Sequence, residues 1–171
     1  MTSQASILVA YGTKKGSTQE VAEAIAATLT EQGHRVDVRA ADEVRALDAY
    51  SGVVLGGALY TGRWHGGARD FLKRHFEALQ DMPLAVYAMG PKTLEEADVA
   101  GSRAQLDAAL AKMPTVTPAF VAIFGGVVDP TKLRFPFNRL PAGDARDWDA
   151  IRQFAEQAGS LFANSAQVVR V

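Results

Sequence analysis

Apolar and polar residues follow two repeating patterns along the chain. Apolar runs such as Val53–Leu55 are continuous, which is typical of strands buried on both faces of a parallel sheet. Between these runs, apolar residues recur at helical spacing, as Val21, Ile25 and Leu29 do. The apolar runs predict strands at residues 6–11, 35–39, 52–58, 83–89 and 117–124. The helical repeats predict helices at residues 18–32, 42–49, 66–79, 95–111 and 145–162.

Five strand–helix units in succession predict an α/β fold, a doubly wound parallel sheet with helices on both faces. The 171 residues suit a single domain, 1–171. Ligands of such sheets bind beyond the carboxyl ends of the strands, where the strand order reverses. We therefore expect functional residues in the loops after the first, third, fourth and fifth strands. The connection 125–144 is long for a compact domain, which is typical of a functional loop.

The loop after the first predicted strand combines glycine with hydroxyl side chains and leads directly into a helix. First-turn N–H groups have no partner within the helix, and the helix dipole favours negative charge there. Thr13, Ser17 and Thr18 add hydroxyl donors, and Gly16 allows the backbone to close around an anion. These features predict a phosphate site. A structural alternative is that Ser17 and Glu20 form a capping box for the helix.

Spacing excludes two familiar phosphate loops. The nucleoside-triphosphate loop has four residues between its glycines and a Lys after the second, whereas Gly12 and Gly16 have three residues between them and Ser17 follows. The dinucleotide fingerprint Gly-x-Gly-x-x-Gly is absent from this turn. No acidic pair ends the first strand, which argues against a metal-dependent phosphoacceptor domain. A mononucleotide flavin is the remaining common ligand of this position.

The same loop resembles the flavodoxin motif aromatic-x-Thr-x-x-Gly-x-Thr-x-x-x-Ala-x-x-aliphatic. The matching residues are Tyr11, Thr13, Gly16, Thr18, Ala22 and Ile25. The resemblance implies the strand order 2-1-3-4-5 and FMN as the cofactor. It assigns the 5′-phosphate to Thr13, Lys14, Lys15, Gly16, Ser17 and Thr18.

The loop after the third strand, residues 56–67, is rich in glycine and carries two aromatic side chains. In flavodoxins this loop supplies an aromatic residue that stacks on the flavin. Tyr60 takes that place here, and Trp64 is the alternative unless it packs over the third helix. The residues expected around the ring are Ala58, Leu59, Tyr60, Thr61, Gly62, Trp64 and Gly90, with Gly125 and Gly126 at its edge. Flavodoxins often have a second stacking aromatic after the fourth strand, but Met89–Thr93 contains none. One flavin face is therefore either covered by another group or left open, and an open face suits access by a substrate.

A branch of the flavodoxin-like domains resembles this chain over a longer stretch. Residues 56–65, the pair Gly125–Gly126 and the pair Asp147–Trp148 resemble the branch that includes menaquinone-dependent protoporphyrinogen dehydrogenase. That branch has a longer, strongly basic and aromatic insertion after the fifth strand, and the insertion here is short. This departure concerns the quinone and porphyrin partners and not the flavin site.

Composition removes several classes of function. The chain has no cysteine, which excludes disulfides, thiolate metal sites and cysteine nucleophiles. Its three histidines are too scattered to predict a metal site. A net charge of −1 argues against nucleic acid as a partner and differs from the acidic balance typical of flavodoxin electron carriers. No secretory signal or membrane span is visible, so we expect a cytoplasmic protein.

These observations together predict an FMN-binding oxidoreductase that passes electrons between the flavin and a small apolar acceptor, of quinone or porphyrinogen type. One alternative is a non-enzymatic electron carrier acting with a redox partner. Another is a binding module that has lost its cofactor, and the hydroxyl-rich loop argues against it. No side-chain acid, base or nucleophile stands out, so no catalytic residue is expected.

Two further segments leave alternatives open. Leu133–Leu140 mixes aromatic and basic residues, which suits a lid, a contact for an apolar anionic substrate or a peripheral contact with a membrane surface. Its aromatic residues would otherwise plug the edge of the core. Basic residues near the start of the third helix either hold a substrate carboxylate or form a solvated face; they are His65, Arg69, Lys73, Arg74 and His75.

Overall fold

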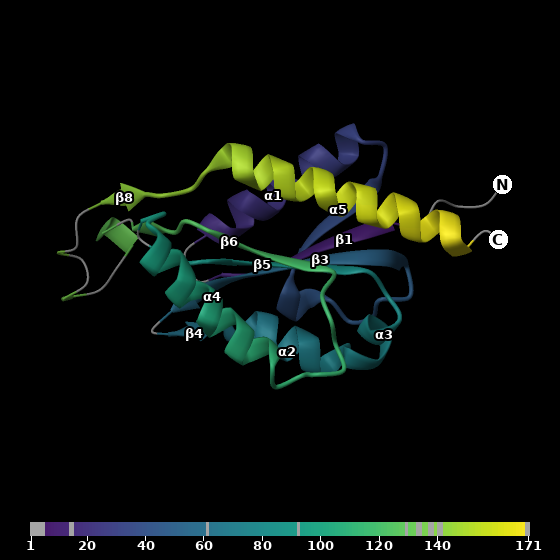
Figure 1. The fold of residues 1–171 in the computed structure, drawn as a ribbon, viewed down its shortest axis with the longest axis horizontal. Coiled ribbons are helices and arrows are strands. Elements are labelled where there is room, and N and C mark those ends of the chain that lie inside the picture. Colours follow the sequence, from purple (N-terminus) through teal and green to yellow (C-terminus); the bar gives the residue numbers. More distant parts are fainter. Residues whose placement is uncertain are drawn as a thin grey trace.

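A mostly parallel sheet forms the centre of the molecule, and helices cover both of its faces (Figure 1). The computed structural model describes residues 6–13, 16–60, 62–91, 93–128, 130–132, 135–136, 139 and 142–169. The parallel strands are β1 (Ser6–Gly12), β2 (Arg35–Ala40), β3 (Tyr50–Tyr60), β5 (Leu84–Met89) and β6 (Phe120–Phe124). They lie in the order β2-β1-β3-β5-β6. Because β5 and β6 are the fourth and fifth predicted strands, the predicted α/β class and the order 2-1-3-4-5 are confirmed.

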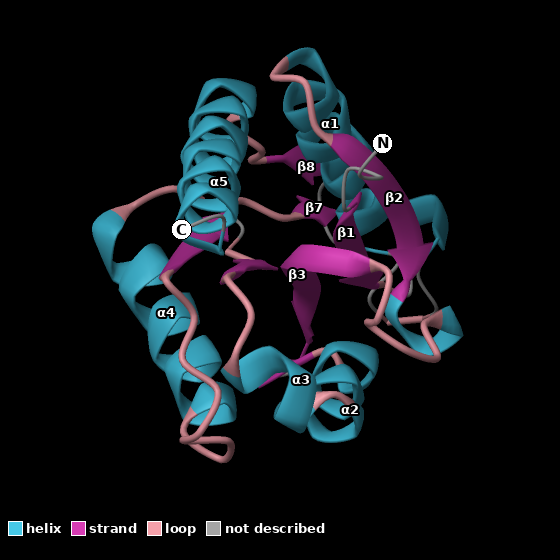
Figure 2. Cartoon of the chain, turned by 90° about the vertical axis from the view of Figure 1, so that its right-hand side faces the viewer, coloured by secondary structure: helices cyan, strands magenta, loops and turns pink. Residues whose placement is uncertain are grey.

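The helices divide into two layers (Figure 2). α1 (Ser17–Glu31) and α5 (Trp148–Val169) pack together on one face of the sheet. α2 (Gly66–Arg74), α3 (Phe76–Gln80) and α4 (Glu96–Leu110) cover the other face. Among the described residues, no helix combines the length and the apolarity that crossing a bilayer demands.

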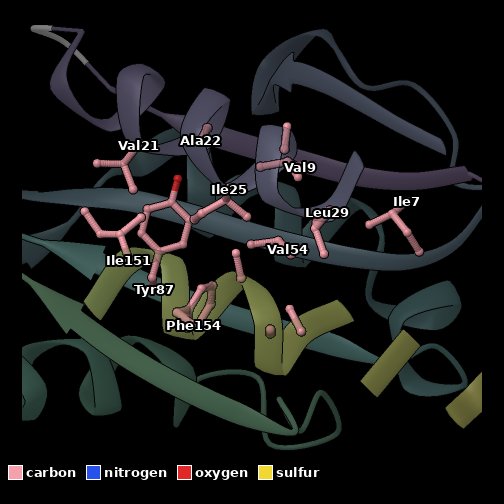
Figure 3. Packing of buried hydrophobic residues seen from close by; sticks show 14 of the residues in the cluster. Ile7, Val9, Val21, Ala22, Ile25, Leu29, Val54, Tyr87, Ile151 and Phe154 are labelled. Atoms are coloured by element: carbon pink, nitrogen blue, oxygen red, sulfur yellow. The ribbon is translucent and has the colours of Figure 1, made fainter. Parts of the chain in front are cut away.

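Burial of β3 on both faces explains its continuous apolar run. Val54 points into the layer of α1 and α5, whereas Val53 and Leu55 point into the opposite layer. In the first layer the rings of Tyr87 and Phe154 meet edge to face, with their centroids 5.8 Å apart (Figure 3). Burial of one large apolar side chain stabilises a fold by about 1.5–3 kcal/mol, so these two layers account for much of the stability.

The predicted helix at 42–49 is wrong. Only a short 3-10 helix, η1 (Ala41–Glu43), forms between β2 and β3, and the backbone of Val44 is already extended. Val44 and Leu47 are both buried, and their spacing of three residues imitates a helical repeat. So short a segment forms too few hydrogen bonds to offset the cost of helix nucleation, so tertiary packing decides its path.

Side chains at the end of α2 hold this connection in place. Arg74 Nη2 donates to the Ala41 carbonyl at 2.7 Å, and His75 Nε2 lies 3.3 Å from the Val44 carbonyl. The helix predicted at 66–79 breaks at His75 into α2 and α3. The two contacts satisfy main-chain carbonyls that a helix between β2 and β3 would have bonded itself.

Three two-residue strands were not predicted from the sequence, because they are too short to show alternation. β4 (Arg63–Trp64) folds back antiparallel on the end of β3. β7 (Val127–Val128) and β8 (Gly143–Asp144) form an antiparallel hairpin within the long connection before α5. A 3-10 helix, η2 (Pro130–Lys132), follows β7. The hairpin lies at the left of Figure 1, at the opposite end of the molecule from α3.

The burial of His75 predicts a pH-dependent stability. Desolvation lowers the pKa of His75, the contact with the Val44 carbonyl raises it, and the charge of Arg74 lowers it, with a net lowering. The folded state therefore favours the neutral ring, and stability is lost as the pH falls below the unfolded-state pKa of about 6.5. We expect the Tm to fall between pH 7 and pH 5. His75→Gln keeps a donor and cannot gain a proton, so it should flatten that fall; equal slopes in the two proteins would contradict the prediction.

Candidate functional site

Four loops meet at one edge of the sheet. The register pairs Gly12 of β1 with Gly57 of β3, Ala58 of β3 with Met89 of β5, and Met89 with Phe124 of β6. Because these strands are parallel, the loops that follow them leave the sheet at the same edge. The structure therefore brings the predicted phosphate, ring and ring-edge segments to one side of the molecule.

A left-handed glycine closes the loop after β1. Gly16 has a φ of 87°, which other L-residues adopt only at a cost. Its N–H donates to Thr13 Oγ1 at 3.0 Å, and its carbonyl accepts from the Glu20 N–H at 3.2 Å. Gly16 is thus the N-cap of α1 and no side chain caps it, so the alternative capping box of Ser17 and Glu20 does not form. Lys14 and Lys15 lie outside the described residues.

The hydroxyl of Thr18 is buried in the first turn of α1. Thr18 is fully buried, and its Oγ1 has no hydrogen-bond partner among the described residues. The Thr18 carbonyl accepts from the hydroxyl of Tyr87 at 3.4 Å, and Figure 3 shows that hydroxyl directed toward α1. An unpaired buried polar group costs about 1–3 kcal/mol, so a hydroxyl of this kind suits a ligand that would bond it.

Tyr87 reaches α1 because β3 has no side chain in its way. A Cβ on Gly56 would lie 1.9 Å from the Tyr87 ring, so the ring occupies the space above this glycine. Burial raises the pKa of the Tyr87 hydroxyl, and so does the neighbouring Tyr11. The hydroxyl therefore remains a neutral donor beneath the loop.

The end of β3 and β4 form a tight hairpin that carries the predicted ring residues. Tyr60 pairs with Arg63, and Gly62 in the turn has a φ of 79°. The rings of Tyr60 and His65 meet edge to face with centroids 6.5 Å apart. A Cβ on Gly12 would lie 2.7 Å from His65 Nδ1, so this hairpin packs directly against the end of β1. Thr61 lies outside the described residues.

Trp64 belongs to the core. Its side chain is 1% exposed, and its Nε1 donates to the Gly57 carbonyl at 3.0 Å. It packs against Ala68 of α2, beneath the hairpin. The structure therefore agrees with the packing alternative for Trp64, whereas Tyr60 is half-buried at the end of β3.

The predicted glycines after β5 and β6 lie in close contact with their neighbours. A Cβ on Gly90 would lie 2.7 Å from the Leu59 Cβ, and one on Gly126 would lie 3.2 Å from the Gly90 Cα. The Gly126 N–H donates to the Pro91 carbonyl at 2.9 Å. A Cβ on Gly125 would collide with the main-chain carbonyl of Ala145. Because these glycines lack side chains, the loops after β5 and β6 pack closely against each other and against Leu59.

A cluster of charged residues beside this surface was missed by the sequence analysis. Arg146 donates to Asp144 through Nε at 3.0 Å and through Nη2 at 2.7 Å, and to Glu20 of α1 through Nη1 at 2.5 Å. The Arg146 hydrogen bonds hold the pKa of Asp144 below its ordinary value, against a smaller opposing effect of burial. Charged residues show no periodic pattern along a sequence. The contact of Glu20 and Asp144 with one guanidinium could therefore be found only in the folded structure.

Three of the basic residues around α2 bond main-chain carbonyls of the scaffold. Arg69 Nε donates to the Trp64 carbonyl at 3.0 Å, and Arg74 and His75 contact the connection before β3 as described above. Nothing in their placement supports a substrate carboxylate. Within the described ranges, no three His, Asp or Glu side chains form a group that could hold a metal ion.

The segment 133–140 is only partly described. Phe135 is 70% exposed, so it does not plug the core, and the Arg139 guanidinium lies 5.1 Å from the centre of its ring. Pro136 is also described. The other residues of the segment lie outside the described residues; they are Leu133, Arg134, Phe137, Asn138 and Leu140.

Residues 8–140 match the family model of the flavodoxin domain. The chain belongs to the flavodoxin domain family. Family membership implies FMN as the cofactor and a redox function, as the sequence predicted.

Known proteins similar to this flavodoxin-family chain include a dehydrogenase, a flavodoxin and a flavodiiron core. Protoporphyrinogen IX dehydrogenase (quinone) of Escherichia coli strain K12 is 31% identical over 84 residues, which cover 48% of this chain and 46% of that protein. The match therefore spans less than half the length of that relative. Flavodoxin 2 of Bacillus cereus has a TM-score of 0.56 and 20% identity, covering 94% of this chain and 99% of that one. The flavodiiron core Flv1 of Synechocystis has a TM-score of 0.62 and 16% identity, covering 96% of this chain and 36% of that one. These two structures show the fold alone.

The residues present fit an FMN phosphate. The Thr18 hydroxyl is unpaired among the described residues, and it lies in the first turn of a helix, where N–H groups and the helix dipole favour an anion. The left-handed Gly16 turns the backbone back just before those N–H groups.

Thr18→Val tests whether the buried hydroxyl is unpaired. Valine replaces the hydroxyl with a methyl group of similar shape, so the unfolding free energy of the flavin-free protein should stay equal or rise by about 1 kcal/mol. The matched control Thr18→Ser keeps the hydroxyl and loses a buried methyl group, which should cost about 0.5–1.5 kcal/mol. Urea unfolding measures both. A loss of more than 1 kcal/mol in the valine variant would show that the hydroxyl has a partner in the flavin-free protein.

Proposed function

We propose that this flavodoxin-family protein is an FMN-dependent oxidoreductase that passes electrons from the flavin to a small planar acceptor such as a quinone. The observation that carries the flavin assignment is the buried hydroxyl of Thr18, which has no partner among the described residues and lies close to the turn at Gly16. The acceptor class is supported by the Escherichia coli relative, a protoporphyrinogen IX dehydrogenase (quinone).

The loop after β1 would hold the phosphate. First-turn N–H groups of α1 and the Thr18 hydroxyl are donors on one side of the loop, and the two lysines would add positive charge. Each hydrogen bond to a charged group contributes about 1.5–3 kcal/mol, so a few such bonds separate FMN from riboflavin. The residues assigned to the phosphate are Thr13, Lys14, Lys15, Gly16, Ser17 and Thr18.

The loops after β3, β5 and β6 would hold the flavin ring. Tyr60 offers an aromatic face, and the glycines after β5 and β6 leave main-chain groups close to the ring edge. Trp64 is left out of the assignment because it is buried in the core. The residues assigned to the ring are Ala58, Leu59, Tyr60, Thr61, Gly62 and Gly90, with Gly125 and Gly126 at its edge.

One face of the ring would remain accessible to the acceptor. The sequence from Met89 to Glu96 has no aromatic residue, so the loop after β5 has no second ring to stack on the flavin. Gly90 in that loop packs against Leu59 and has no side chain that would project over the ring. A planar acceptor can approach such a face without large rearrangement.

Bound FMN would supply the electron chemistry, and the protein sets its orientation and potential. An apolar wall made by Tyr60 and Ala58 disfavours negative charge on the reduced ring, because charge is costly in a low-dielectric site. No side-chain acid or base is needed for this role.

Tyr60→Ala tests the stacking assignment. Loss of the ring should restore flavin fluorescence in the FMN-bound protein and make the potential of the fully reduced couple less negative, because water reaches the reduced flavin. Tyr50→Phe is the control, since Tyr50 begins the same strand at the other end and bonds Asp37 there. Unchanged fluorescence and potential in Tyr60→Ala would remove Tyr60 from the site.

Stopped-flow mixing separates the enzyme from a carrier. Photoreduced protein should be oxidised rapidly and saturably by a water-soluble benzoquinone, and only slowly by cytochrome c. Phe135→Ala should raise the half-saturating quinone concentration about three- to tenfold, because an exposed apolar contact is lost. Phe76→Ala is the matched control, since Phe76 is 37% exposed on α3, at the opposite end of the molecule (Figure 1). Slow, non-saturating oxidation by quinone with fast transfer to cytochrome c would instead establish a carrier.

A further inference from the structure

Arg146 contacts residues of β8, α1 and the start of α5. Its guanidinium bonds Asp144 of β8 through two nitrogens and Glu20 of α1 through the third. It also lies over the ring of Trp148 at the start of α5, with the guanidinium carbon 4.8 Å from the ring centre. Only 10% of the Arg146 side chain is exposed. The side chain is therefore fixed by its partners and not a freely solvated charge.

Glu20 lies next to the loop assigned to the phosphate. Its N–H donates to the Gly16 carbonyl, so about one helical turn, roughly 5.4 Å, separates Glu20 from that loop. A carboxylate in the first turn stabilises a helix through its dipole. The same carboxylate opposes a bound phosphate, because both groups are negative and lie within one Debye length at physiological salt.

We propose that Arg146 is a positioning residue for the FMN phosphate, which holds the Glu20 carboxylate in an ion pair so that its charge does not oppose the ligand. This inference rests on the function proposed above. Without Arg146, the Glu20 carboxylate would lose its ion-pair partner in the first turn of α1. The Glu20 side chain is 58% exposed, so salt screens its charge once the ion pair is lost.

A second arginine offers a matched control on the same pair of helices. Arg152 of α5 pairs with Glu31 at the end of α1 at 2.8 Å and with Glu156 at 3.2 Å. It thus also bridges two carboxylates between α1 and α5. Its position differs, because the fifteen residues of α1 place Glu31 about 20 Å from the first turn.

The test compares FMN with riboflavin, which differ only in the phosphate. Dissociation constants of both flavins are measured by fluorescence titration of the flavin-free protein at 20 mM and 500 mM salt. The variants are Arg146→Met, Arg146→Lys, Glu20→Gln, the double variant Arg146→Met/Glu20→Gln, and Arg152→Met. Circular dichroism and the Tm establish that each variant is folded.

The inference predicts a loss that is specific to the phosphate. At low salt Arg146→Met should lower the preference for FMN over riboflavin about three- to fivefold, and the double variant should restore it. Arg146→Lys and Arg152→Met should keep the preference, and high salt should shrink the loss. Glu20→Gln alone should raise the preference, which keeps the test decisive if Arg146→Met does not fold.

Other outcomes overturn the inference. Equal weakening of both flavins in Arg146→Met would show that Arg146 only supports the scaffold, and so would a loss that Glu20→Gln does not restore. An unchanged preference in Arg146→Met, or in Glu20→Gln alone, would show that the pair has no effect on the phosphate. If the unaltered protein itself fails to prefer FMN, the phosphate assignment of the proposed function falls as well, and that result is distinct from the others.

Discussion

Two adjacent glycines in β3 allow one large aromatic ring to pack on each face of the sheet. Gly56 leaves space for the ring of Tyr87, and Gly57 leaves space for the indole of Trp64. Each ring then bonds a main-chain carbonyl: Tyr87 that of Thr18 in α1, and Trp64 that of Gly57 itself. The loop after β1 and the hairpin of β3 and β4, which we propose for the phosphate and the flavin ring, are therefore supported from below by two buried aromatic groups. A side chain at either glycine would displace one of these supports.

Stability and ligand binding oppose each other at the start of α1. The buried Thr18 hydroxyl, which has no partner among the described residues, raises the free energy of the flavin-free protein. The aromatic core beneath offsets this cost, with the rings of Phe124 and Phe154 also meeting edge to face at 5.5 Å. An unsatisfied polar group above a densely packed core is the distribution expected of a preorganised site.

The sequence predicted the sheet and its order because continuous apolar runs and helical repeats are local signals. The same local rule produced the wrong helix at 42–49, where Val44 and Leu47 are buried by tertiary packing at a helical spacing. The four site loops follow from topology, and glycine and hydroxyl residues identify them. The burial of Trp64 and the bridge from Arg146 to Glu20 depend on contacts between segments far apart in the sequence, which no periodicity encodes.

The two tryptophans of the chain occupy opposite environments. Trp64 is enclosed beneath the hairpin of β3 and β4, whereas Trp148 is 45% exposed and lies against Arg146. A collisional quencher such as iodide therefore reaches one indole and not the other. Intrinsic fluorescence thus divides into a quenchable part that reports on the start of α5 and a protected part that reports on the integrity of the core. The protein carries its own pair of optical probes, one at the charged bridge and one at the scaffold, without any label.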